Sequence, residues 1–599
     1  MSDKTLKNRS EINKKYKWNI EDMFHDESVI QTDIDKVLEM TKSYSNYAGK
    51  LTENGATLLN AFKDRDEIWQ KLEKVFVYAR MRRDEDNRDT KYQAMTDKCN
   101  SIIAQVSASM SFFTPEILDT PKDVLLKYIE EVPGLCEYSF IILDLLREKE
   151  HILTKSEENI MAQMGEITGA TNDIFTMLNN ADIKFGTIID EDGDEVELTH
   201  GNYITFMESH DRSVRKAAYN SMYASYKALI NTIASAYNYN TKADVISARI
   251  RKYDSARQAS LSGDNINEEV YDNLVKVVNE NLPAVHKYME IRKKLLKVDE
   301  LQMHDIYVPL VELPKKVISY EEALDIMRDG LAPLGKEYID RMNKGIDAGW
   351  IDVYENQGKT SGAYSFGSYD SMPYILLNYT NTLKDVFTIV HEMGHSMHSS
   401  YTREFQPYSY GSHSIFTAEV ASTVNESLLM HHLLGKEKDP EMKKYLLNLY
   451  IEEFRTTLFR QTMFAEFEHL THNAIEEGQV LTADWMCNEY EKLNIKYFGP
   501  ALGTDDIIKY EWARIPHFYN AFYVYKYATG YSAATALSEK ILNEGPEARD
   551  AYVHFLTTGE SDYPINLLKG AGVDMSSSKP IEKAMETFKN LVDEFEKLV

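Results

Sequence analysis

The stretch from Leu383 to His398 constrains the fold more than any other part of this 599-residue chain. It contains the sequence H-E-M-G-H, in which His391 and His395 are four residues apart and Glu392 directly follows the first histidine. On an α-helix, side chains four residues apart lie on the same face, one turn apart. Two imidazoles placed in this way can bind one Zn²⁺ ion, while the glutamate stays free to act as a base.

The residues around this motif are typical of an amphipathic helix. Thr382 and Asp385 have the spacing of a capping box, which marks a helix N-terminus. Apolar residues then recur at helical spacing: Val386, Phe387, Ile389, Val390, Met393 and Met397. The alternative is a core helix with two buried histidines, so the metal hypothesis depends on a third ligand.

Two kinds of third ligand can be compared. The metzincin pattern requires a histidine at position 401, where this chain has Tyr401. His398 is predicted to lie on the helix surface or to support a ligand, and a ligand role for it stays open. A second predicted helix, beginning near Phe416, carries Glu419 and Glu426 on one face. Two histidines and one glutamate leave a coordination position for water, as in catalytic zinc sites.

Composition excludes several classes of partner. With 95 acidic and 67 basic residues, the chain has a net charge of −28, which opposes binding to nucleic acid or to an anionic membrane. Its three cysteines are far apart and give no disulfide framework, which favours a reducing compartment. The N-terminus is polar and no apolar run is long enough to span a membrane. We therefore expect a cytoplasmic protein.

The length of the chain exceeds what one hydrophobic core usually supports. We predict an N-terminal helical lobe over residues 1–200 and a catalytic domain over residues 201–599. Strand-prone runs on either side of Asp192-Gly193 predict a hairpin near this boundary. Glycine-punctuated aromatic segments between residues 350 and 380 predict a small sheet directly before the metal helix. An edge strand there can pair with extended peptide backbone.

A further segment, Ile515-Pro516-His517-Phe518-Tyr519, lies far downstream. Pro516 can begin a helix, on which Tyr519, Tyr523 and Tyr527 would share one face. A stripe of tyrosines usually serves packing. In a chain that also carries a predicted zinc site, it supplies hydrogen-bond donors for an oxygen that gains negative charge during a reaction.

Together these segments resemble the thimet-oligopeptidase-like family of zinc metallopeptidases, in its oligoendopeptidase F branch. Four segments carry the resemblance: Pro373–Tyr379, His391–His398, Phe416–Ser422 and Ile515–Tyr519. It implies a mostly α-helical, two-lobed protein with a small β-sheet beside the metal helix and a deep substrate channel. It also implies activity on short, unstructured peptides.

The resemblance also assigns roles to individual residues. It implies one Zn²⁺ per chain, with three ligands: His391, His395 and Glu419. Glu392 corresponds to the general base of the family. The C-terminal donors of the family correspond to His517 and to one or more tyrosines: Tyr519, Tyr523 and Tyr525.

We therefore expect a zinc-dependent endopeptidase that hydrolyses internal bonds of short oligopeptides by a zinc-activated water. One alternative is a carboxypeptidase-type zinc peptidase, which needs a cationic residue to bind the terminal carboxylate, and the sequence does not locate one. Another is a non-enzymatic peptide-binding protein with a structural zinc. Such a site usually has four protein ligands, often cysteines, and Cys487 is the nearest cysteine to the motif.

Overall fold

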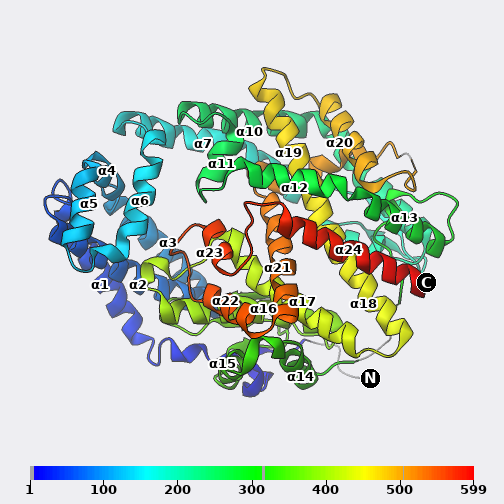
Figure 1. The fold of residues 1–599 in the computed structure, drawn as a ribbon, viewed down its shortest axis with the longest axis horizontal. Coiled ribbons are helices and arrows are strands. Elements are labelled where there is room, and N and C mark those ends of the chain that lie inside the picture. The colour runs from blue at the N-terminus through cyan, green and yellow to red at the C-terminus, as the bar shows by residue number, and fades with distance from the viewer. Residues whose placement is uncertain (1–5, 313–316, 504) are drawn as a thin grey trace. The chain divides into compact units, whose positions relative to one another are not determined.

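The computed structural model describes residues 6–312, 317–503 and 505–599, which are mostly helical (Figure 1). Residues 1–5 of the polar N-terminal segment lie outside this description. The chain forms two compact units, each built from three segments. Unit 1 comprises Met1–Glu150, Lys316–His432 and Leu537–Gly572, and unit 2 comprises His151–Lys315, Leu433–Ala536 and Val573–Val599. The predicted helical, two-lobed fold is confirmed, whereas the boundary at residue 200 and the deep channel stay predictions.

Unit 1 combines helices from both ends of the chain with a three-stranded sheet. Its elements are α1 (Ser28–Tyr44), α2 (Gly55–Glu85), α3 (Thr90–Ser109), α4 (Phe113–Asp119), α5 (Lys122–Glu131), α6 (Ser139–Glu148), α14 (Tyr320–Gly330), α15 (Gly335–Asp347), β3 (Ile351–Asp352), β4 (Tyr364–Phe366), β5 (Tyr374–Leu376), α16 (Leu383–Phe405), α22 (Pro546–Leu556) and α23 (Pro564–Gly570). The helix α17 (Ile415–Lys436) begins in this unit and ends in unit 2.

The described residues of unit 2 form helices and one hairpin. Its elements are α7 (Lys155–Met177), β1 (Thr187–Ile189), β2 (Glu195–Glu197), α8 (His200–Met207), α9 (Arg212–Ala228), α10 (Ile230–Ile250), α11 (Ala256–Ser262), α12 (Glu268–Glu280), α13 (Leu282–Leu296), α18 (Pro440–Glu453), α19 (Arg460–Glu476), α20 (Ala483–Phe498) and α24 (Lys579–Leu598). The helix α21 (Tyr525–Glu544) begins here and ends in unit 1. The predicted hairpin is confirmed, since β1 and β2 pair antiparallel with Thr187 opposite Glu197.

The small sheet of unit 1 places an edge strand against the predicted metal helix. Its strand order is β3-β5-β4, with β5 parallel to β3 and antiparallel to β4. Both β4 and β5 pack against α16. The Ser365 hydroxyl of β4 lies 2.7 Å from the Ser396 hydroxyl of α16, which fixes the strand beside the helix. The sheet predicted from the glycine-punctuated aromatic segments is therefore present.

A buried charge cluster attaches the N-terminal segment to this sheet. The carboxylate of Asp352, only 1% exposed, accepts a hydrogen bond of 2.7 Å from Arg9 and pairs at 2.7 Å with the buried ammonium of Lys359. Burial by itself would raise the pKa of Asp352, but the charges of Lys359 and Arg9 outweigh that effect and lower it. Removing one partner of such a buried cluster leaves uncompensated charge.

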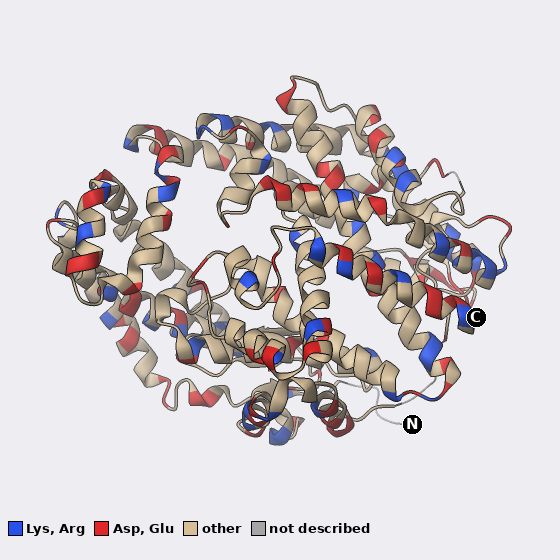
Figure 2. Cartoon of the chain, viewed as in Figure 1, with Lys and Arg blue, Asp and Glu red and all other residues tan. Residues whose placement is uncertain are grey.

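Charged residues are otherwise distributed along the helices. Figure 2 shows acidic and basic residues interleaved on most of them, with acidic residues in excess. No helix within the described ranges is both long and apolar enough to cross a membrane.

The Asp352 cluster gives a first prediction. Asp352→Asn leaves the buried charge of Lys359 without its carboxylate and leaves Arg9 with Glu85 alone, so we expect the free energy of unfolding to fall by about 3–5 kcal/mol. Chemical denaturation of both proteins at pH 7 measures the difference.

Asp325→Asn is the matched control, because Asp325 pairs with Arg328 but is 79% exposed; we expect a loss of about 0–1 kcal/mol. The folded pKa of Asp352 lies below its ordinary value of 3.8, so the wild-type carboxylate contributes stability above that value and loses it as the pH falls through the folded pKa. The Asp352→Asn effect should therefore shrink at low pH. An effect no larger than that of the control would contradict the account.

Candidate metal centre

The helix α16 presents its two histidines to one point. The predicted capping box is present: Thr382 donates its backbone N–H to Asp385 at 2.8 Å, and Asp385 donates its own to the Thr382 hydroxyl at 3.2 Å. The apolar residues predicted to form the packed face of this helix are buried. His391 and His395 stay partly exposed, with 27% and 22% of their side chains accessible.

Three side-chain atoms have the spacing of zinc ligands. The Nε2 atoms of His391 and His395 lie 3.2 Å apart, and the Oε2 atom of Glu419 lies 3.6 and 3.7 Å from them, respectively. In a tetrahedral zinc site with bonds of about 2.0–2.2 Å, two ligand atoms lie roughly 3.3–3.6 Å apart. Two imidazoles and one carboxylate also match the ligand set of catalytic zinc. The residues present therefore fit a zinc ion.

Gly394 lets the two helices that carry the candidate ligands, α16 and α17, approach this closely. A Cβ atom at this position would lie 2.6 Å from the Ser422 Cα atom and 2.8 Å from the Ala421 carbonyl oxygen of α17. Asn425 of α17 also donates a hydrogen bond of 3.3 Å to the Val390 carbonyl. The glycine between the two histidines thus sets the distance at which Glu419 meets them. The H-E-x-x-H pattern accepts any residue at position 394, so the sequence did not predict this role of Gly394.

Neighbouring groups contact each candidate ligand. Glu426 lies 3.2 Å from Nδ1 of His391, which leaves Nε2 to face the proposed metal position. The ring of His395 hydrogen-bonds the backbone carbonyl of Ala418. The Ser422 hydroxyl lies 3.3 Å from the Glu419 carboxylate and donates to it. Sequence spacing left open whether Glu426 is a ligand or a supporting acceptor, and its contact with His391 favours the supporting role.

The charges of the site shift the pKa values of both histidines. Burial lowers the pKa of His391, but the hydrogen bond with Glu426 and the surrounding carboxylates outweigh that effect and raise it to about 9. Burial and the charge of His391 lower the pKa of His395 to about 4. A metal ion at this site therefore competes with a proton mainly at His391.

Glu392 has the environment of a general base. It is 8% exposed, and burial raises the pKa of its carboxyl to about 7, with His391 acting in the opposite direction. The backbone N–H of Ser365, in the edge strand β4, donates to this carboxylate. The strand and the helix therefore position this carboxyl group, and its pKa lies near the pH at which a carboxyl group can both accept and return a proton.

His398 is buried rather than on the helix surface. It is 2% exposed, and its ring centroid lies 3.7 Å from that of His413 and 5.4 Å from that of Phe555. The surface position predicted from its spacing is wrong, because the loop between α16 and α17 and the helix α22 cover this side of α16.

The predicted C-terminal donors belong to unit 2 and separate into three groups, one of which is Tyr525, with its ring centroid 5.2 Å from that of Tyr271. The ring centroids of His517 and Tyr523 lie 6.1 Å apart, and that of Tyr527 lies 6.0 Å from His517 and 5.5 Å from Tyr523. Tyr519 stacks instead on Phe175 at 4.4 Å. The structure therefore brings His517 and Tyr523 together and places Tyr519 in a different contact.

The helix predicted to run from Pro516 through Tyr527 is wrong. A short 3₁₀ helix, Pro516–Tyr519, ends before a turn, and α21 begins at Tyr525. Within that turn Phe522 has a φ of 54°, in the left-handed region that bulky residues rarely adopt. The buried carboxylate of Glu468 accepts the Phe522 backbone N–H at 2.6 Å and so stabilises this conformation. The stabilising contact comes from a distant helix, so the local pattern did not reveal the break.

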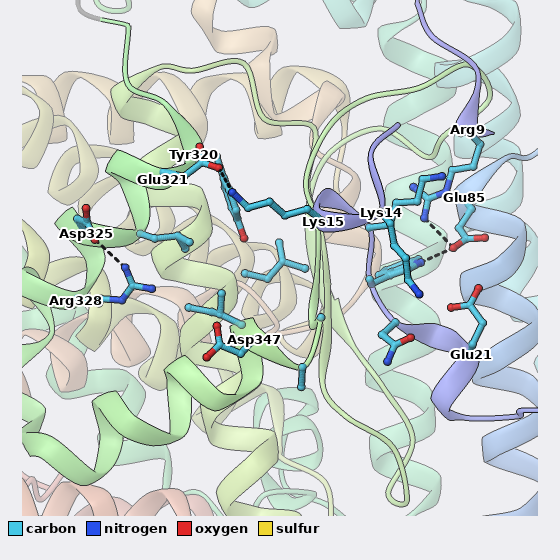
Figure 3. A pocket seen from close by; sticks show the side chains of 18 of the residues that line it. Arg9, Lys14, Lys15, Glu21, Glu85, Tyr320, Glu321, Asp325, Arg328 and Asp347 are labelled. Atoms are coloured by element: carbon cyan, nitrogen blue, oxygen red, sulfur yellow. Dashed lines mark hydrogen bonds and ion pairs between the residues drawn. The ribbon is translucent and has the colours of Figure 1, made fainter. Parts of the chain in front are cut away.

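A pocket elsewhere in unit 1 lacks the metal-centre residues. It has a volume of about 1030 Å³ and is lined by the N-terminal segment, α2, α14 and α15 (Figure 3). Several of its charges pair with each other, at 2.6 Å for Lys15–Glu321 and 2.8 Å for Arg328–Asp325. It offers none of the candidate ligands or donors, so we do not assign the chemistry to it.

Comparison with known proteins identifies the family of this chain. Residues 205–587 match the family model of Peptidase family M3, and residues 116–185 match the family model described as Oligopeptidase F. Oligopeptidase PepF of Bacillus subtilis is 46% identical over 99% of this chain and 89% of its own length. Group B oligopeptidase PepB of Streptococcus agalactiae is 43% identical, over 99% of this chain and 98% of its own.

A solved structure is also similar over nearly the whole chain. The crystal structure of oligoendopeptidase-F from Enterococcus faecium has a TM-score of 0.76 and 39% identity, and covers 96% of this chain and 99% of its own. The chain belongs to peptidase family M3. It is a metallo-oligopeptidase, as the sequence predicted.

The close approach at Gly394 gives a second prediction. Gly394→Ala places a methyl group against the backbone of α17, so the helices must move apart and Glu419 must move away from the two histidines. We expect a loss of stability of about 1–3 kcal/mol and a lower zinc affinity. Calorimetric unfolding and competition with a zinc chelator measure the two effects.

Gly435→Ala is the control, because Gly435 also lies in α17 but a Cβ atom added there would meet no other atom within 4 Å. Alanine is the better helix former, so we expect no loss of stability there. If the Gly394→Ala variant bound zinc as tightly as the Gly435→Ala variant, the close approach of α16 and α17 would not be required for zinc binding.

Proposed function

We propose that this chain is a zinc-dependent oligoendopeptidase that hydrolyses internal bonds of short, unstructured peptides. The proposal rests mainly on the convergence of His391, His395 and Glu419, with the buried Glu392 beside them. The names of the relatives, oligopeptidase and oligoendopeptidase F, support it. In this proposal the three converging side chains hold one Zn²⁺ ion.

When bound, zinc acidifies water and polarises a peptide carbonyl. The protein residues then perform three tasks. Glu392 accepts the proton of the attacking water and delivers it to the leaving amine nitrogen, because its raised pKa suits both transfers. Glu426 holds the ring of His391 in the orientation that ligation requires. The backbone of β4 pairs with the extended peptide, which selects for chain conformation more than for side chains.

His517 and a tyrosine are proposed to stabilise the peptide oxygen that gains negative charge. The grouping of His517, Tyr523 and Tyr527 supports Tyr523 as the first candidate for the phenol donor. Tyr519 is the second candidate, because its hydroxyl is buried with no hydrogen-bond partner among the described residues. Burial lowers the pKa of His517, so its imidazole is neutral at pH 7 and donates through one ring N–H.

The role of Glu392 gives a third prediction. Glu392→Gln keeps the shape of the side chain but removes the proton acceptor, so we expect near-complete loss of hydrolysis with zinc content unchanged. Glu419→Ala should instead lose zinc, because one ligand is gone. Both are compared with the wild type on one quenched-fluorescent peptide, with metal content measured in parallel and products identified by mass.

Internal cleavage by the wild type alone would support both the base and the endopeptidase mode. Release of single terminal residues would favour the carboxypeptidase alternative. Equal hydrolysis by wild type and Glu392→Gln would contradict the assignment of the base.

The phenol donor gives a fourth prediction. Tyr523→Phe removes one hydrogen bond to the charged oxygen, so kcat should fall by about 10²–10³ while KM changes little. Tyr519→Phe and Tyr510→Phe are measured beside it, the latter as a control outside the ring cluster. A large fall in Tyr519→Phe with none in Tyr523→Phe would move the role to Tyr519.

A further inference from the structure

The proposed mechanism gives no role to Glu468, a buried carboxyl group on α19 of unit 2. Its side chain is 0% exposed. The Oε1 atom accepts the backbone N–H of Phe522 at 2.6 Å, whereas Oε2 has no hydrogen-bond partner in the part of the chain that the structure describes. Burial raises the pKa of this carboxyl group to about 8, with His472 acting in the opposite direction. A buried carboxyl group with an unpaired oxygen lowers the stability of a protein, so stability alone does not account for Glu468.

Glu468 holds a turn in an unfavourable backbone conformation. Phe522 has a φ of 54°, in the left-handed region that is costly for a residue with a bulky side chain. Its ring is buried, with its centroid 4.5 Å from that of His472 on α19 and 5.8 Å from that of Tyr271 on α12. The helix α19 therefore contacts both the backbone and the ring of Phe522. Because the conformation is unfavourable by itself, the turn depends on such contacts.

Two further contacts fix the chain on either side of this turn. Ser260 of α11 donates a hydrogen bond of 2.9 Å to the carbonyl of Ala521. Lys526, in the first turn of α21, pairs with Asp264 at 2.7 Å. Since both sides of the turn are fixed, the backbone conformation of Phe522 determines the orientation of the residue that follows it.

The residue that follows is Tyr523, the first candidate for the phenol donor. Phe522 and Val524 are both 0% exposed, while Tyr523 between them is only partly buried. The turn therefore directs the ring of Tyr523 away from the core. It lies beside the exposed His517, with ring centroids 6.1 Å apart and an angle of 21° between the ring planes. An extended or helical backbone at Phe522 would send the chain in another direction and separate the two rings.

We propose that Glu468 is a positioning residue, which acts through the backbone of Phe522 to hold Tyr523 beside His517. Its side chain is fully buried, so it does not contact the peptide itself. The inference rests on the proposed function, because it assigns to Glu468 the task of holding a donor that the function requires. It adds a residue from a distant helix to the groups on which the reaction depends.

Two substitutions of Glu468 test this role. Glu468→Leu removes the acceptor for the Phe522 N–H and keeps a side chain that suits a buried helix position. Glu468→Gln keeps an acceptor oxygen and is neutral, as the carboxyl group mostly is at pH 7. A displacement of about 1 Å can lower a rate about 10²-fold, so we expect kcat of Glu468→Leu to fall by about this factor. KM should change little, and Glu468→Gln should stay close to the wild type on the same quenched-fluorescent peptide.

Thr462→Val is the matched control. Thr462 is also fully buried on α19, but its hydroxyl bonds the Leu458 carbonyl of its own helix at 2.8 Å. The control therefore loses a buried hydrogen bond of α19 without touching the turn, and its kcat should be unchanged. Equal kcat values for Glu468→Leu and Thr462→Val would overturn the proposal. So would a Glu468→Gln variant as slow as Glu468→Leu, because the acceptor oxygen would then not matter.

A double-mutant cycle separates positioning from a general effect on the fold. Tyr523→Phe removes the hydroxyl that Glu468 is proposed to position. If Glu468 acts through this hydroxyl, Glu468→Leu should lower kcat much less in the Tyr523→Phe protein than in the wild type. The same fall in both proteins would show that the two residues act independently and would contradict the proposal.

Hydrogen–deuterium exchange tests the turn without turnover. We expect the amides of residues 517–527 to exchange faster in Glu468→Leu than in the wild type and in Glu468→Gln, with the rest of unit 2 unchanged. If the wild type cleaves no peptide, the proposed function fails, while exchange still tests whether Glu468 holds the turn. Unchanged exchange of this segment would contradict the proposal. Faster exchange throughout unit 2 would make the effect one of folding and would also overturn it.

Discussion

The close approach of α16 and α17 is the constraint on which the metal centre depends. Gly394 leaves no side chain between the helices, and so the backbone of α17 at Ala421 and Ser422 lies against α16. At this distance one carboxylate meets the Nε2 atoms of both histidines, and a second carboxylate, one heptad later, meets Nδ1 of the first. If α16 and α17 lay farther apart, the same histidines and glutamates would be solvated separately and would not meet at one point. The short distance between α16 and α17 thus brings residues from two helices into one site.

Much of this site follows from sequence because helical spacing is a local property. His391 and His395 share a face whatever surrounds them, and Glu419 and Glu426 share one in the same way. Which glutamate meets which histidine depends on how the two helices are aligned, and that alignment depends on Gly394 and Asn425 contacts across the interface. The sequence pattern therefore left both glutamates open, and the family resemblance rather than spacing favoured Glu419.

The errors of sequence reasoning arise where distant residues decide the local conformation. The tyrosines after Pro516 have helical spacing, but Glu468 stabilises a left-handed Phe522 and the helix begins later. His398 has the spacing of a surface residue, but His413 and Phe555 cover it. Similarly, the apolar residues Ile160, Met164 and Ile167 of α7 have helical spacing, but they are exposed in the structure.

The most direct test of the metal centre is an anomalous-scattering map of zinc-loaded crystals, collected on both sides of the zinc absorption edge. The account predicts one strong peak at about 2.0–2.2 Å from Nε2 of His391, Nε2 of His395 and a carboxylate oxygen of Glu419. Glu426 should lie outside bonding distance and contact Nδ1 of His391. A peak bound instead by Glu426 or His398, or no peak at these histidines in protein that contains zinc, would contradict the account.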